Sequence, residues 1–303
     1  MRIKFSRSGL GTHGEKGQEP TTSLERHLDM SKIWKLFTNK GSAAAYALLT
    51  AVFTVVPEDY FNLRTINNNW VEETNILVNR LIVCVIVFTL ANVVYNVYLM
   101  NRKRVFIHGK NYSIQIEYGD LFKVKGGKVI IDFDECYTTN KSYAPEGIKP
   151  DSVCGQYLSK NPISNIEKLI STAGVSPAKG KSEYKGKPKY ESGTIVPNGE
   201  YFLMAFAKLD KDGRGVLTYD QYIESLNMLW QQIDLYHGTS DVYMPILGSR
   251  IVRFDKELTQ QELLDIIIGS YRLSSKKLRE PCKLHIVCRK RDGFSLNDVC
   301  GVE

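Results

Sequence analysis

Two short glycine-containing segments are the residues of this sequence whose types and spacing most suggest ligand chemistry. Gly248-Ser249 follows an apolar run that ends at Leu247, so the backbone can turn there and aim its N–H groups at an anion. The guanidinium of Arg250 can add a charge-assisted contact to the same anion. Cys154-Gly155-Gln156 can supply a second turn of this kind. Taken alone, either segment is more often an ordinary connection between two elements.

A cluster of acids ends the apolar run that we predict to be a strand over Lys128–Asp134. Asp132, Asp134 and Glu135 have side chains of the type that transfers protons in catalysis, which makes them candidate acids or bases. Acids that follow a strand are more often solvated or capping groups. Both interpretations of this cluster stay open.

Metal ligation is not predicted. The segment Asp210–Gln221 has the outline of a calcium-binding loop, but Arg214 stands where a ligand belongs and Gln221 replaces the closing acid. We therefore predict a hairpin or a strand-to-helix turn at Gly213 and Gly215. The cysteines form no C-x-x-C pair and have no His at metal-ligand spacing, which favours reduced thiols in a cytosolic domain.

The elements that must position these residues follow an α/β pattern from Val105 onward. We predict strands over Ser113–Tyr118, Lys128–Asp134, Tyr201–Lys208, Asp241–Leu247 and Lys283–Arg289, and helices over Asn165–Thr172, Tyr219–Tyr236, Thr259–Tyr271 and Ser295–Val299. Thr259, with Glu262 three residues later, forms a capping box at the start of one helix. Strands that alternate with helices predict a mixed or mostly parallel sheet covered on both faces. Ligands of such sheets bind beyond the carboxyl ends of the strands, where the segments above fall.

Two stretches of this domain are predicted to lack regular structure. Lys141–Pro162 carries scattered Pro and Gly and is typical of a loop. Gly174–Lys189 is rich in Lys, Gly, Ser and Pro, which predicts a mobile surface insertion.

The N-terminal third of the chain contains two long apolar runs. No residue of Leu81–Met100 is charged, and a helix of about 20 residues is roughly 30 Å long, which matches the hydrocarbon core of a bilayer. A buried helix of a soluble core is the alternative, but such helices rarely run so long without a charge. Ala43–Val56 is shorter; an extension back through Trp34 reaches spanning length, with a re-entrant or interfacial helix as the alternative. We predict a transmembrane hairpin with spans at about 34–56 and 80–100.

Charges around the hairpin predict its orientation. The loop Pro57–Asn79 carries mainly acids, while both outer flanks carry Lys and Arg. The positive-inside rule then places the N-terminus and the C-terminal domain in the cytoplasm, in a multi-pass protein of the inner membrane. The chain has a net charge of +7, and most of the excess of Lys and Arg lies near these spans. This distribution favours anionic lipid over nucleic acid as a partner. Asn92 and Asn96 lie one turn apart, so they can hydrogen-bond a neighbouring helix or line a wet path, with chance placement as the alternative.

These patterns divide the chain into three parts. Residues 1–30 are polar and lack the apolar core of a signal peptide, which predicts a disordered extension with Met30 as a plausible alternative start. Residues 31–104 hold the transmembrane hairpin, and residues 105–303 form the α/β domain.

The sequence resembles divergent macro domains in the order of four segments: Gly119-Asp120-Leu121, Val129–Glu135, Cys154-Gly155-Gln156 and Pro245–Arg250. Within that superfamily it is most similar to the ThsA effector family of type II Thoeris antiphage defence, whose members also place two transmembrane helices before the macro domain. The resemblance covers roughly residues 30–303 and implies a macro-like, nucleotide-binding α/β domain with a mixed sheet flanked by helices.

The resemblance implies that this domain binds ADP-ribose or a relative. In macro domains the Asp of the Gly-Asp-Leu-like turn accepts a hydrogen bond from the adenine amine, a role that Asp120 inherits by position. The implied ligand-binding residues are Asp120, Leu121, Asp132, Cys154, Gly155, Gln156, Leu247, Gly248, Ser249 and Arg250. Hydrolytic macro domains commonly have an Asn after the second strand and a triple Gly in the first phosphate loop, and this sequence has neither. That departure favours a binding-only sensor without catalytic residues, cofactor or metal.

Two functions from different classes follow from the resemblance. The first is a membrane effector that senses a histidine–ADP-ribose conjugate made by a TIR-domain partner. Ligand-driven homo-oligomeric assembly then disrupts the membrane and kills the infected cell, an abortive infection. The second is a membrane-anchored ADP-ribosyl hydrolase, which turnover of the ligand would support.

Overall fold

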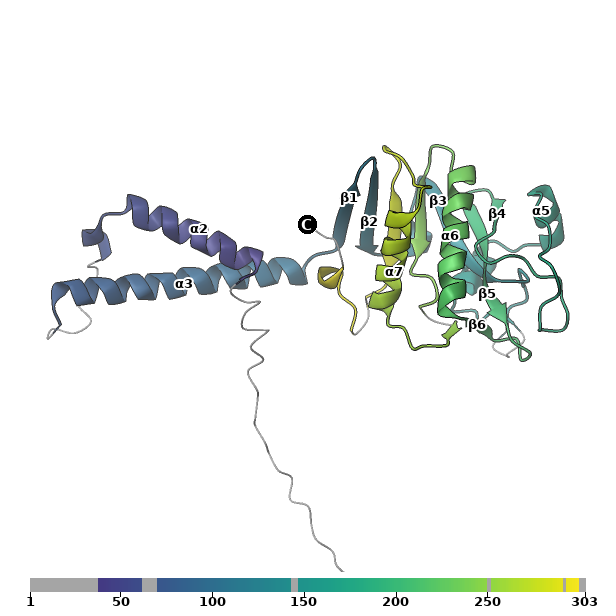
Figure 1. Ribbon diagram of the computed structural model, residues 1–303, viewed down its shortest axis with the longest axis horizontal. Coiled ribbons are helices and arrows are strands. Elements are labelled where there is room, and N and C mark those ends of the chain that lie inside the picture. The colour runs from purple at the N-terminus through teal and green to yellow at the C-terminus, as the bar shows by residue number, and fades with distance from the viewer. Residues whose placement is uncertain (1–37, 62–69, 143–146, 250–251, 291–292, 300–303) are drawn as a thin grey trace, which may run out of the picture. The chain divides into compact units, whose positions relative to one another are not determined.

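The computed structural model describes residues 38–61, 70–142, 147–249, 252–290 and 293–299 (Figure 1). The chain forms two compact units, Met1–Tyr98 and Leu99–Glu303. The first unit is helical and the second is an α/β sheet domain.

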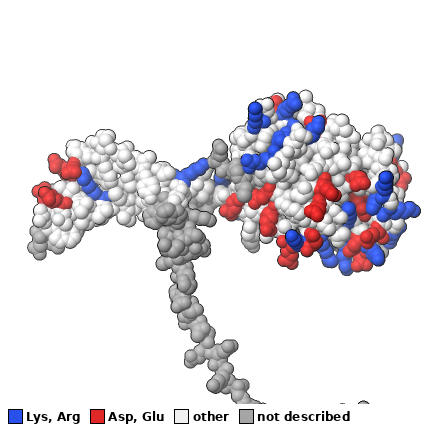
Figure 2. All heavy atoms as spheres, viewed as in Figure 1, with Lys and Arg blue, Asp and Glu red and all other residues white. Residues whose placement is uncertain are grey.

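The helical unit contains α2 (Lys40–Val55), the 3-10 turn η1 (Glu58–Phe61) and α3 (Glu72–Met100). Among the described residues, α3 alone is long and apolar enough to cross a membrane, as its length and composition predict. The prediction of a two-helix transmembrane hairpin is not confirmed, because the 16 residues of α2 are fewer than a full span needs. Figure 2 shows the helical unit almost free of charge along its length, with acids gathered near η1 and the start of α3.

Small and polar side chains hold α2 against α3. A Cβ at Gly41 would lie 2.7 Å from the Cβ of Tyr95, so the two backbones approach closely there. The Oδ1 atom of Asn92 accepts hydrogen bonds from Asn39 Nδ2 at 2.8 Å and from Ser42 Oγ at 3.3 Å. The predicted hydrogen bond to a neighbouring helix is therefore confirmed for Asn92. Asn96 instead donates to the Asn92 carbonyl within its own helix.

The second unit is one mixed sheet with helices on both faces. Its strands are β1 (Arg104–Gly109), β2 (Tyr112–Tyr118), β3 (Gly127–Asp134), β4 (Ile195–Asn198), β5 (Tyr201–Leu209), β6 (Gly215–Leu217), β7 (Asp241–Pro245), β8 (Arg253–Phe254) and β9 (Leu284–Cys288). The strand order is β1-β2-β9-β7-β3-β5-β6-β8, with β4 on β5. The strands from β2 to β5 in this order run parallel, whereas β1, β4 and β6 join as antiparallel neighbours. The predicted mixed sheet is confirmed.

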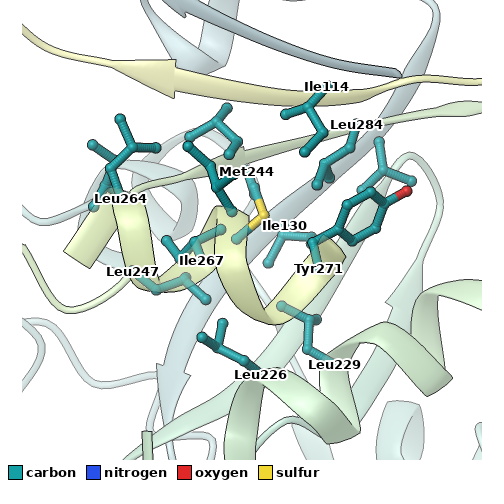
Figure 3. Packing of buried hydrophobic residues seen from close by; sticks show 14 of the residues in the cluster. Ile114, Ile130, Leu226, Leu229, Met244, Leu247, Leu264, Ile267, Tyr271 and Leu284 are labelled. Carbon is teal, nitrogen blue, oxygen red and sulfur yellow. The ribbon is translucent and has the colours of Figure 1, made fainter. Parts of the chain in front are cut away.

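Two helix layers cover this sheet. The α-helices are α4 (Val153–Lys160), α5 (Ile166–Thr172), α6 (Tyr219–Tyr236) and α7 (Gln260–Leu273), with short 3-10 turns η2 (Leu121–Lys123) and η3 (Leu296–Asp298). Figure 1 shows α6 and α7 side by side across one face. The alternation of side chains along β3 serves both layers, because Ile130 packs in the α6–α7 core while Ile131 and Phe133 pack in the α4–α5 core. Figure 3 shows the first of these cores.

Most predicted elements are present, including the short helix α5, whereas one helix was missed. The capping box at Thr259 is present, and the predicted turn at Gly213 is a hairpin between β5 and β6. The prediction of a loop over Lys141–Pro162 is wrong, because α4 lies within it. With eight residues that include Gly and Ser, α4 has little helix propensity of its own and depends on tertiary packing of Tyr157 and Leu158.

Candidate ligand-binding cleft

The separation of two parallel strands creates the cleft. Pairing between β3 and β7 runs from Gly127–Asp241 to Val129–Tyr243, and both strands continue beyond it toward their carboxyl ends. The chain is not paired across this position, so side chains and a ligand can enter between the strand ends. This is the position where open α/β sheets bind ligands.

Two adjoining cavities occupy this edge of the sheet. The β3 cavity has a volume of about 300 Å³ and lies at the ends of β3 and β5. Its lining includes Asp132, Asp134, Cys154, Tyr184, Arg214 and Arg253. The smaller β2 cavity, of about 50 Å³, lies at the ends of β2, β7 and β9. Its lining includes Leu121, Val153, Ile246, Ser249, Gln260 and Val287. Val153 and Cys154 are consecutive, so the first turn of α4 separates the two cavities.

The first turn of α4 is built to present backbone N–H groups. Ser152 is the N-cap: its Oγ accepts from Gly155 N–H at 2.9 Å and donates to the Lys149 carbonyl. The first N–H groups of a helix have no acceptor within the helix, so those of Val153 and Cys154 point out of its positive end. Cys154-Gly155-Gln156 is therefore a helix start, where the sequence predicted a loop.

The glycine and the glutamine of this turn have structural contacts. A Cβ at Gly155 would lie 2.1 Å from the Lys149 carbonyl oxygen, so only Gly admits the preceding backbone. The Gln156 side chain donates to the Asp151 carbonyl at 2.9 Å. Gly155 thus serves the packing of the backbone and Gln156 caps a nearby carbonyl, whereas Cys154 lines the β3 cavity.

The acids at the end of β3 have three different environments. Asp134 Oδ1 accepts from the N–H groups of Cys136 and Thr138, which partly offset the rise in its pKa caused by burial. Glu135 is buried and links three segments, since its Oε1 accepts from Ser182 Oγ and from Leu209 N–H. These two acids are structural groups, as one interpretation of the sequence expected.

Asp132 differs from its neighbours. Its Oδ1 is buried and has no hydrogen-bond partner in the described residues, although the side chain lines the β3 cavity. Burial raises the pKa of Asp132 to about 6, and a hydrogen bond from its own backbone N–H only partly opposes this. Burial, then the nearby Asp132 and Asp134, raise the pKa of Cys154 well above its ordinary value. Both groups are thus held toward their neutral forms.

A tight turn that the sequence did not single out forms one wall of the β3 cavity. Ser182 N–H donates to the Lys187 carbonyl, and Lys185 and Gly186 both have positive φ, at 53° and 59°. The ring of Tyr184 at this turn is buried and lines the cavity. This part of the predicted surface insertion is therefore packed against the site. The Lys185-Gly186 pair was the available turn signal.

A family comparison identifies the domain. The model of a family described as "Thoeris protein ThsA, Macro domain" matches residues 114–289, more than half of the chain. The chain belongs to the ThsA macro-domain family. The Thoeris protein ThsA of Bacillus amyloliquefaciens (strain Y2) is 27% identical over 231 residues, which cover 72% of this chain and 77% of that protein.

Solved macrodomains of Oceanobacillus iheyensis were also compared with this ThsA-family chain. A point mutant of that macrodomain has a TM-score of 0.42 and 10% identity, covering 63% of this chain and 91% of the other. The same macrodomain with ADP has a TM-score of 0.35 and 8% identity; the match covers 62% of this chain and 89% of that macrodomain. The family membership rests on the sequence match.

The turn after β7 of this ThsA macro domain contains residues that pack in the core and a residue that lines a cavity. Gly248 has φ of 78°, and a Cβ there would lie 2.7 Å from Phe254 Cζ, so the turn requires glycine. Ser249 lines the β2 cavity. Leu247 is fully buried in the α6–α7 core, as Figure 3 shows, so its side chain is not available to a ligand. Arg250 lies outside the described residues.

The Gly-Asp-Leu turn of the ThsA macro domain lies at the end of β2. Asp120 is exposed and caps η2 by accepting from Phe122 N–H at 3.0 Å. Leu121 is buried and lines the β2 cavity. Sequence reasoning thus located residues at the ends of β2, β3 and β7 and at the start of α4, and the fold brings them to one edge of the sheet.

Proposed function

We propose that this chain is a membrane-associated effector of Thoeris defence whose macro domain binds an ADP-ribose-derived signal across the start of α4. Membership in the ThsA family supports antiphage defence and a ligand of the ADP-ribose type. The observation that carries the placement is the pair of adjoining cavities with a capped helix N-terminus between them. A ligand with a diphosphate in its middle and a bulky group at each end matches that arrangement.

Each part of the ligand has a place in this proposal. The diphosphate lies over the N–H groups of Val153 and Cys154, which favour negative charge. The adenosine end lies toward the β2 cavity, where Leu121 supplies apolar contact and Asp120 lies nearby in sequence to accept from the adenine amine. The other end enters the β3 cavity beside Asp132.

The proposed effector step uses the helical unit. The apolar, largely exposed surface of α3 suits a lipid environment. The proposed second span, over residues 34–56, then keeps the N-terminus and the macro domain together on the cytoplasmic side. By family resemblance, the signal is a histidine–ADP-ribose conjugate made by a TIR-domain partner. Binding must favour the assembled state through a difference in affinity, so that homo-oligomers disrupt the membrane.

A second candidate function is hydrolysis of an ADP-ribosyl bond. The observation that favours it is Asp132, which lines the β3 cavity and whose Oδ1 has no hydrogen-bond partner in the described residues. Its pKa of about 6 is close to the value that suits a general base. The binding-only proposal predicts that ADP-ribose conjugates remain intact after long incubation with the chain. Multiple turnovers, seen by mass spectrometry, would decide for the hydrolase.

Calorimetry on the full chain in detergent tests the binding site. Ser249 lines the β2 cavity, so the variant Ser249→Glu adds a carboxylate near the proposed position of the diphosphate. Because the two negative charges repel, we expect at least about a tenfold loss of affinity for ADP-ribose. Ser275→Glu makes the same change at an exposed residue away from both cavities and should bind as the wild type does. Equal affinity in the two variants contradicts the proposed placement.

A charge within α3 tests the effector step separately. Leu90 is exposed on α3, and Leu90→Arg puts a costly charge in the centre of the candidate span. We expect unchanged ligand affinity and loss of signal-dependent membrane depolarisation. Leu235→Arg makes the same change at an exposed position of α6 and should retain depolarisation. Depolarisation that persists in Leu90→Arg contradicts a membrane role for α3.

A further inference from the structure

The cap at Asn39 fixes where α2 begins. The backbone of Asn39 is extended, with ψ of 166°, and its side chain accepts from Ser42 N–H at 2.8 Å. The regular helix that follows, Lys40–Val55, has 16 residues and a length of about 24 Å. The hydrocarbon core of a bilayer is about 30 Å thick. The uncharged stretch of α3, Leu81–Met100, matches that thickness, whereas α2 is too short for it.

Contacts along the pair fix the level of α2 against α3. At one end Gly41 lies against α3, where an added Cβ would come within 2.7 Å of the Cβ of Tyr95. At the other end the guanidinium of Arg80 lies over the ring of Phe53, 5.8 Å from its centroid. The two helices therefore run antiparallel (Figure 1), and the last turns of α2 reach the level at which the uncharged stretch of α3 begins.

A charged residue stands at each end of this shared apolar length. Arg80 pairs with Glu58 at 2.9 Å at one end. Lys40 is exposed at the other end and precedes the glycine that contacts Tyr95. Beyond the level of Tyr95, α3 continues for five residues, or about 8 Å. If α3 crosses a bilayer over its whole uncharged stretch, Lys40 lies about 8 Å inside the hydrocarbon, where a charge is costly. A lysine side chain can extend toward the headgroups over part of this distance, and the lipid must supply the rest.

This difference in length sets a requirement on the membrane. We infer that the α2–α3 pair thins the bilayer around Lys40, and that the mismatch draws copies of the chain together. The inference rests on the proposed function, which places α3 in the membrane. Lipid is the partner of this surface because apolar side chains such as Leu48 on α2 and Val93 on α3 are exposed. Lipid thins around a span that is too short, and copies that share one thinned patch have less strained lipid around each of them.

Vesicles whose bilayers differ in thickness provide the test. The full chain, labelled at Met1 with a donor or an acceptor dye, is reconstituted into phosphatidylcholine with monounsaturated chains of about 14 or about 22 carbons. We expect energy transfer between copies to rise at least about twofold from the thin to the thick bilayer, because the mismatch grows with thickness. Deuterium NMR of perdeuterated lipid chains measures thinning directly, and the order of the chains should fall as protein is added.

Two variants and a control separate thickness from charge. Lys40→Leu removes the charge at the start of α2, so the rise in energy transfer and the fall in chain order should both become smaller. Asn92→Leu removes the oxygen that accepts from Asn39 and Ser42, which frees Lys40 from its level against α3 and should weaken both responses as well. The control Lys103→Leu removes the same charge at an exposed residue outside both helices and should respond as the wild type does.

The outcomes separate this inference from the proposed function. Weaker responses in Lys40→Leu and Asn92→Leu, with a wild-type response in Lys103→Leu, support the inference. Equal energy transfer in the thin and the thick bilayer, unchanged chain order, or an equal loss in Lys40→Leu and Lys103→Leu overturns it, while signal-dependent depolarisation of cells keeps the proposed function. If the chain fails to float with vesicles of either thickness, the proposed membrane role fails and this inference fails with it.

Discussion

Removing the charge of Asp132 should stabilise the ligand-free protein at neutral pH. The carboxyl group has a pKa of about 6 in the folded state, against an ordinary value of 3.8. A raised pKa means that folding disfavours the ionised form. Above pH 6 the group is ionised in both the folded and the unfolded chain, so the wild type carries the full penalty. As the pH falls from 6 toward 4, the folded protein takes up a proton and the penalty disappears.

The size of the effect follows from the two pKa values. Each unit of difference between the folded and unfolded pKa corresponds to about 1.4 kcal/mol. The shift from 3.8 to about 6 therefore corresponds to a loss of about 3 kcal/mol in folding stability when Asp132 is ionised. The residue is partly exposed to the cavity, where water can reduce the penalty, so we expect Asp132→Asn to gain about 1–2 kcal/mol at pH 7.5.

Denaturant unfolding between pH 4 and pH 8 measures this difference. Trp230 is buried in the α6–α7 core and donates to Ser270 Oγ, so its fluorescence reports on the α/β unit. The exposed control Asp220→Asn should stay within about 0.5 kcal/mol of the wild type throughout. Equal stability of wild type and Asp132→Asn at pH 7.5, or a gain that persists at pH 4, would refute the reasoning.

Three further predictions concern single positions. Gly248→Ala should lower the free energy of unfolding by at least about 2 kcal/mol, because φ is positive there and the added Cβ meets the ring of Phe254. Gly174→Ala, where φ is 67° but the space around the Cβ is open, should lower it by about 1 kcal/mol. Denaturant unfolding compares the two variants. Asn92→Leu should separate α2 from α3, seen as faster proteolysis in detergent, while Asn96→Leu should not. Tyr60→Cys, at an exposed residue of η1, should react with an impermeant thiol reagent in intact cells; protection there contradicts the predicted topology.

The sequence by itself determined the features that depend on neighbouring residues. Alternating and continuous apolar runs predicted the central strands, because side chains in a strand face opposite sides of the sheet. The capping box at Thr259 was readable because all its atoms lie within one helical turn. The apolar length of α3 and the ordered segments that resemble ThsA macro domains were likewise visible in the linear chain.

Tertiary structure decided which of these residues face the ligand cleft. Leu247 and Gly155 looked like ligand contacts, but packing places the first in the core and makes the second a close contact of the Lys149 backbone. The α4 helix escaped prediction because its stability comes from the sheet beneath it. Oδ1 of Asp132 has no hydrogen-bond partner among the described residues, because strands far apart in the sequence bury this atom and supply no donor. Local pattern cannot report such an absence, because a hydrogen-bond partner is a property of the neighbours that folding brings together.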